Sequence, residues 1–136
     1  MKRLIFALAL LAAPARAATL QVEVTNIRSS LGEILVAVCT RDEFLKPHCT
    51  YNARAPAHPG AVTVTVPDVP PGIYAVQAFQ DDNNSGQIRR SLLGIPEEGV
   101  GFSRDAPFRF GPPSFADAAI DLGPQGGQIS FALRYF

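Results

Sequence analysis

The sequence predicts an all-β protein, a single antiparallel β-sandwich of about seven short strands. Apolar residues alternate with polar ones in most apolar segments, which is the periodicity of strands that bury one face. Clusters of Gly, Pro, Asn and Asp separate these segments at short intervals. The length of the chain is typical of one domain, expected over residues 18–136.

The expected strands follow one another along the chain. The first three alternating segments are 20–24, 34–38 and 62–66. Residues 73–80 are apolar on both faces, which is typical of a central strand. Phe108 and Phe110 are expected to begin another strand, and alternation returns at 118–122 and 129–135. We predict one core that contains Val22, Val36, Val64, Val76, Ile120 and Phe131.

The first 17 residues have the three parts of a signal peptide. Lys2 and Arg3 are followed by ten apolar residues, 4–13, and then by a small-x-small cleavage motif that ends at Ala17. Ten apolar residues are too few for a membrane-spanning helix, which needs about 20. The sequence therefore predicts a periplasmic or secreted protein that does not span a membrane, cleaved near Ala17.

The net charge of the cleaved chain limits the classes of macromolecule that it is expected to bind. Cleavage would leave nine basic residues against twelve acidic ones, a net charge of −3, and no basic run. This composition argues against nucleic acid as a partner.

The two cysteines are expected to form a disulfide. Cys39 and Cys49 are close in the sequence, and two such cysteines usually pair in an oxidising compartment. Between them, Thr40 and Glu43 have the spacing of a capping box, which predicts one helical turn before Pro47.

Several motifs of the second half resemble those of the bacterial family called domain of unknown function 2141. The motifs are the runs VPDVPPGIYAVQAFQDDNNSG, LLGIPEEGVGFS and GPPSFADAAIDL. The resemblance implies a small exported protein with an immunoglobulin-like or transthyretin-like sandwich and no assigned activity. The family's loop typically reads H-D-x-N-x-N-G-x-x-D, whereas this chain has Gln80, Ser85 and Arg89 in place of the His, the second Asn and the last Asp.

The 81–104 segment is a long loop between strands, and part of it matches a calcium-binding loop. Asp81, Asn83 and Ser85 have the alternating spacing of oxygen ligands, and a glycine follows them. Glu98 would have to supply the distant carboxylate, and the positive charge of Arg89 would weaken binding. The alternative is a polar turn, since Asp, Asn, Ser and Gly favour turns for backbone reasons alone.

Two further interpretations of this segment stay open. Arg89, Arg90 and Phe102 could line a groove for an anionic ligand, but core packing is the favoured role of Phe102. Glu98 and Asp81 could form the carboxylate pair of a hydrolase.

We therefore expect an exported binding or interaction module whose 81–104 loop contacts an unknown protein or small-molecule ligand. The first alternative is a structural accessory domain in which this loop packs on the domain itself. The second is a hydrolase that uses Glu98 and Asp81.

Overall fold

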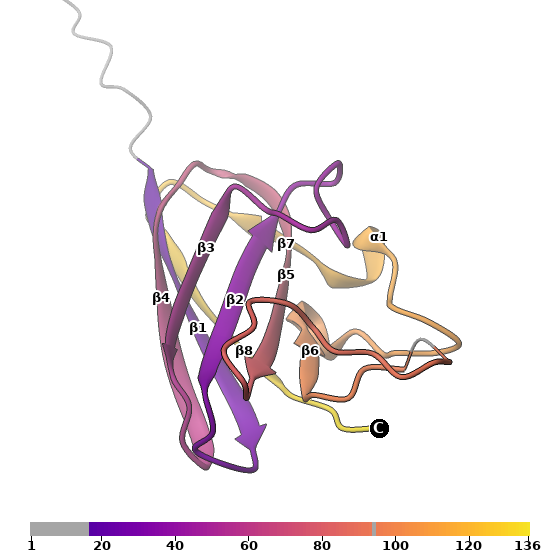
Figure 1. Cartoon of the computed structure of the whole chain (residues 1–136). Coiled ribbons are helices and arrows are strands. Elements are labelled where there is room, and N and C mark those ends of the chain that lie inside the picture. Colours follow the sequence, from indigo (N-terminus) through magenta and orange to yellow (C-terminus); the bar gives the residue numbers. More distant parts are fainter. Residues whose placement is uncertain (1–16, 94) are drawn as a thin grey trace, which may run out of the picture.

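The computed structural model describes residues 17–93 and 95–136, so the predicted signal peptide lies outside the described residues apart from Ala17. The described chain contains eight strands in two sheets (Figure 1). This arrangement confirms the predicted all-β class and is that of a sandwich. The helical elements of the described residues are the short turns η1 and α1, and neither could span a bilayer.

The smaller sheet has three strands in the order β4-β1-β8. Strand β1 (Ala18–Ile27) is its centre and pairs antiparallel with β4 (Gly60–Val69). On its other side β1 pairs parallel with β8 (Gly127–Ala132). The predicted alternation holds in β1, since Leu20, Val22 and Val24 are all buried.

The larger sheet is antiparallel throughout. Its strands are β3 (Tyr51–Pro56), β2 (Glu33–Cys39), β5 (Gly72–Asp81) and β6 (Val100–Phe102), in that order. Strand β7 (Ala119–Leu122) pairs with β5 on the same edge as β6, nearer the start of β5. Strand β5 is thus central, as its apolar residues on both faces predict.

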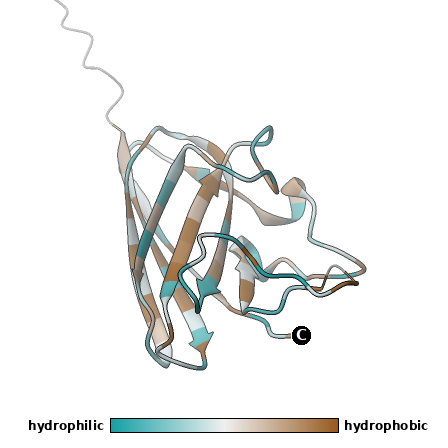
Figure 2. Ribbon diagram, viewed as in Figure 1, coloured by the Kyte–Doolittle hydropathy of each residue, from teal (hydrophilic) through white to brown (hydrophobic). Residues whose placement is uncertain are grey.

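The core between the two sheets contains the six predicted residues. Five of them are buried, and Ile120 is partly buried against the same cluster: Val22, Val36, Val64, Val76, Ile120 and Phe131. Figure 2 shows apolar and polar residues alternating along the strands that enclose this core. The hydroxyl of Tyr74 closes one corner by donating a 2.6 Å hydrogen bond to the carbonyl oxygen of Pro70.

A second apolar cluster lies on the outer face of the five-stranded sheet, on the opposite side from the core. Three chain segments cover this face, 40–49, 82–99 and 103–118, and we call them the outer cover. They include η1 (Ser103–Asp105) and α1 (Phe115–Ala118). Phe44 packs edge-to-face against Phe102 and against Phe115, with ring centroids 6.0 Å apart in each pair.

A disulfide joins Cys39, the last residue of β2, to Cys49. Their Cα atoms are 5.1 Å apart, a separation typical of disulfides. The segment between them contains the predicted turn, in which a Glu43 carboxylate oxygen accepts a hydrogen bond from the Thr40 backbone N–H at 3.2 Å. The disulfide therefore fixes the 40–49 segment of the outer cover to strand β2 of the five-stranded sheet.

The structure corrects two details of the predicted strands. Phe108 and Phe110 begin no strand, because Phe110 has a positive φ of 50° within a Gly- and Pro-rich segment and is fully exposed. Ala118 ends α1 rather than beginning a strand. Strand β3 was not predicted, because its residues are only partly buried on one face and include no Val or Ile.

Candidate functional site

The outer face of the five-stranded sheet carries a groove roofed by the 82–99 segment. It consists of two adjoining hollows of about 630 and 210 Å³. The hollows share five lining residues: Pro47, His48, Gln77, Phe79 and Gly86. The larger volume lies in the range of small-molecule binding sites, roughly 300–1,000 Å³. The groove is therefore the candidate functional site.

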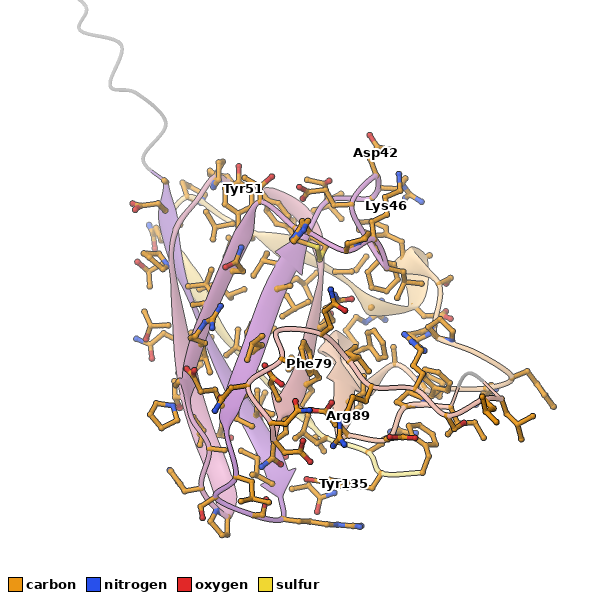
Figure 3. The ribbon with its side chains drawn as sticks, viewed as in Figure 1. Asp42, Lys46, Tyr51, Phe79, Arg89 and Tyr135 are labelled. Atoms are coloured by element: carbon orange, nitrogen blue, oxygen red, sulfur yellow. A yellow bond between two sulfur atoms is a disulfide. The ribbon has the colours of Figure 1, made fainter. Side chains whose placement is uncertain are left out.

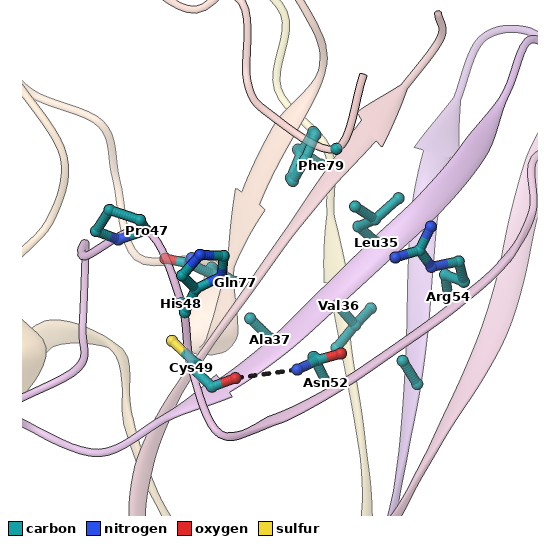
Figure 4. A pocket seen from close by; sticks show the side chains of 12 residues that line it. Leu35, Val36, Ala37, Pro47, His48, Cys49, Asn52, Arg54, Gln77 and Phe79 are labelled. Atoms are coloured by element: carbon teal, nitrogen blue, oxygen red, sulfur yellow. Dashed lines mark hydrogen bonds between the residues drawn. The ribbon is translucent and has the colours of Figure 1, made fainter. Parts of the chain in front are cut away.

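Residues of several strands and loops form the walls of the groove. Gln77 and Phe79 come from the outward-facing positions of β5, and Figure 4 shows His48 and Pro47 on one side of the smaller hollow with Arg54 and Leu35 on the other. The larger hollow extends to Ile88 on the 82–99 segment and to Phe108. Both apolar and polar groups thus face the space.

Asp81 ends β5 and holds the turn that follows. Its side chain is only 2% exposed. One carboxylate oxygen accepts the backbone N–H of Ser85 at 2.9 Å, and the other accepts that of Gly86 at 2.6 Å. The Ser85 hydroxyl lies 3.3 Å from the first oxygen. Asp81 therefore acts as the internal acceptor of a closed turn.

Glu98 connects the two ends of the 82–99 segment. Its side chain is nearly inaccessible, and its Oε2 accepts the Asp82 N–H at 3.1 Å. Its Oε1 accepts the backbone N–H and the Nε–H of Arg89, at 3.1 and 3.2 Å. The same guanidinium donates to both carboxylate oxygens of Asp82, at 2.7 and 2.9 Å. The hydrogen bond to Glu98, together with the charge of Asp82, raises the pKa of Arg89.

The predicted site residues therefore separate into two groups. Asp81 bonds to Ser85, and Glu98 bonds to Arg89 and Asp82, in two separate sets of hydrogen bonds, whereas Arg90 and Phe102 line the groove. The Asn83 carboxamide oxygen accepts the Ser85 N–H at 3.3 Å. Within residues 17–93 and 95–136, no cluster of three or more His, Cys, Asp or Glu side chains could hold a metal ion. The guanidinium of Arg89 supplies the positive charge beside the carboxylates of Asp82 and Glu98.

The motif GVGFS of the second half has structural roles. A Cβ on Gly99 would lie 2.8 Å from the ring of Tyr135, and one on Gly101 would collide with the backbone carbonyl of Ala132. Ser103 accepts the Val76 N–H at 2.9 Å and donates to the Ala118 carbonyl. Val76 lies between the stretches of β5 that pair with β6 and β7, so this hydroxyl fills the gap in the ladder.

The fold and the groove define the class of protein: a β-sandwich with a loop-roofed cavity on one outer sheet face. The family described as "Uncharacterized protein conserved in bacteria (DUF2141)" matches residues 22–130, and the chain belongs to this family. This membership confirms the resemblance of the sequence motifs. Comparison with curated proteins and with solved structures gave no match.

Sequence reasoning missed most of the groove. Lys46 and His48 line it from the disulfide-closed segment, and Gln77 and Phe79 line it from β5. The apolar outer face of β5 was the available indication, since it predicted a covered face. No periodicity in the sequence indicated which loops would cover it, or that they would leave an open space.

Proposed function

We propose that this protein is an exported binding module that holds a small molecule in the groove beneath the 81–104 segment. The observation that carries the proposal is the larger hollow of about 630 Å³, walled by the outer cover and floored by β5. A groove of this size with apolar walls and a few polar groups is the usual form of a small-molecule site.

Export is supported by two independent features. The first 17 residues have the charge, apolar run and cleavage motif of a signal peptide. The disulfide between Cys39 and Cys49 suits an oxidising compartment such as the periplasm or the extracellular space. We therefore propose that the mature domain, residues 18–136, acts outside the cytoplasm.

The experiment is a thermal-shift screen of the mature protein against carboxylates, phosphates, sugars and neutral amphiphiles, repeated with a variant that fills the groove. Gln77→Trp places a large ring at a position that lines both hollows. Thr65→Trp is the matched control, because Thr65 is exposed on the other sheet. A ligand of the groove should raise the melting temperature of the wild type and of Thr65→Trp, but not of Gln77→Trp. Absence of any shift, or a shift that Gln77→Trp retains, would contradict the proposal.

The second candidate is a structural accessory domain, which one specific observation favours. The carboxylates of Asp81 and Glu98 accept hydrogen bonds from the 82–99 segment itself, as in a self-packed loop. The same contacts occupy the two groups that a hydrolase would need. A screen without any ligand would leave the accessory domain as the better account.

A further inference from the structure

We infer that the ligand of this groove is an anionic amphiphile, a small molecule with a carboxylate or phosphate head and a short apolar chain. The inference rests on the proposed binding function and specifies the chemistry of the ligand. Two properties of the groove lead to it, the sign of its charged groups and the position of its apolar side chains.

All charged or titratable side chains that line the groove are basic. They are Lys46, His48, Arg54 and Arg90. No Asp or Glu lines either hollow, although acidic residues outnumber basic ones in residues 18–136. A hollow lined by one sign of charge attracts ligands of the opposite sign.

Three acidic groups near the groove are directed toward partners outside it. Glu43 belongs to the same disulfide-closed segment as Lys46, but its carboxylate accepts hydrogen bonds from Thr40 and Thr50. Asp82 and Glu98 are paired with Arg89. Arg54 shares its charge with an acid outside the groove, through a 4.0 Å contact with the partly exposed Glu33. We base the test on Lys46, which lines the larger hollow together with the apolar side chains described next.

The apolar part of the groove lies in the larger hollow. Phe79 faces outward from β5, and Ile88, Phe102 and Phe108 line the same space from the outer cover. In the view of Figure 3, Phe79 is drawn below Lys46 of the disulfide-closed segment and above Arg89 of the 82–99 segment. An apolar chain can bury its surface against these side chains while an acidic head stays near Lys46. Each buried methylene should strengthen binding about three- to fourfold.

The test is isothermal titration of the mature protein with four compounds of equal chain length, all below their micelle concentrations. Decanoate and decyl phosphate carry an anionic head, decanol a neutral one and decylamine a cationic one. We expect both anions to bind at least about tenfold more tightly than decanol, and decylamine not to bind. Octanoate, two methylenes shorter, should bind about tenfold more weakly than decanoate.

Two variants with the same change in net charge locate the head group. Lys46→Gln removes one positive charge from the groove, and Thr65→Glu adds one negative charge on the other sheet. Both positions are exposed, so both variants should fold, which the melting temperature checks. Lys46→Gln should weaken decanoate binding several-fold and leave decanol binding unchanged, whereas Thr65→Glu should change neither.

Failure of this inference and failure of the proposed function give different results. Equal binding of decanoate and decanol, unaffected by Lys46→Gln but lost in Gln77→Trp, would overturn the anionic ligand and keep the groove. Decanoate binding that survives in Gln77→Trp would place the site elsewhere and overturn both. If none of the four compounds binds, the anionic amphiphile is excluded, and the broader screen decides the proposed function.

Discussion

The two faces of the five-stranded sheet are covered in different ways. Toward the three-stranded sheet, regular strands pack side chains such as Val36 and Val76 into a continuous core. On the outer face, loops and short turns pack Phe44, Phe102 and Phe115 around a disulfide and leave a groove. The face packed by strands therefore forms the continuous core, and the face covered by loops leaves the groove in which we propose that a ligand binds.

The largest expected effect comes from a charge in the core between the sheets. Val76→Asp should prevent folding, because an unpaired buried charge costs several kcal/mol against a total stability of about 5–15 kcal/mol. Circular dichroism and a melting curve show whether the variant folds. Thr65→Asp puts the same group at an exposed position opposite Gln21 and should melt cooperatively. A cooperative, stable Val76→Asp protein would mean that the core is misplaced.

The next largest effect should come from the disulfide of the outer cover. The double variant Cys39→Ser, Cys49→Ser should lose about 2–3 kcal/mol of unfolding free energy, since the bond closes a loop of about ten residues. Urea titration measures the loss. Thiol titration of the denatured, unreduced wild type should find no free thiol, and two free thiols per chain would show that the bond does not form.

Ser103→Ala tests the contact between β5 and the outer cover. It leaves the Val76 N–H and the Ala118 carbonyl without their partner, and each buried unsatisfied group costs about 1–3 kcal/mol. We expect a total loss of at least about 2 kcal/mol in urea unfolding, with Ser30→Ala, at an exposed position, within about 0.5 kcal/mol of wild type. A loss no larger than that of the control would show that water replaces the hydroxyl.

Arg89 tests the predicted calcium site. Calcium binding in the wild type should be weak, on the order of 10⁻⁴–10⁻³ M, because the guanidinium already neutralises Asp82 and Glu98. Arg89→Asp should strengthen binding, so that about 10 mM calcium raises its melting temperature more than that of the wild type. Asp81→Ala should abolish the rise. Melting curves unmoved by calcium in every variant would leave the segment as a polar turn.

The smallest effect should be a dependence of stability on pH. The Thr50 hydroxyl is the main group that lowers the pKa of Glu43 below its usual 4.5. A lowered pKa in the folded protein adds stability above the unfolded value, and this stability is lost as the pH falls through the folded value. Glu43→Gln should therefore melt slightly lower at pH 6 and respond less steeply to acid below about pH 4.5. If the melting temperatures of the wild type and of Glu43→Gln fell by the same amount between pH 6 and pH 3, this prediction would be contradicted.

The difference between the two faces also explains how much the sequence predicted. Alternation of Val and Ile located the core between the sheets, because a two-residue period depends only on the strand itself. Strand β6 follows no such period, since it is three residues long and contains Gly101. The groove depends on how loops distant in the sequence are arranged, since Lys46 and Phe108 line the same hollow, and no local sequence pattern encodes that arrangement.

Amide hydrogen exchange of the mature protein tests the contrast between the two faces most directly. The amides of Val22 and Val36 lie in the sandwich strands, whereas those of Ser85, Gly86 and Arg89 belong to the outer cover and donate to the side chains of Asp81, Asn83 and Glu98. The outer cover should open locally, with exchange faster by a factor on the order of a hundred or more. A single opening free energy shared by both sets of amides would contradict the account.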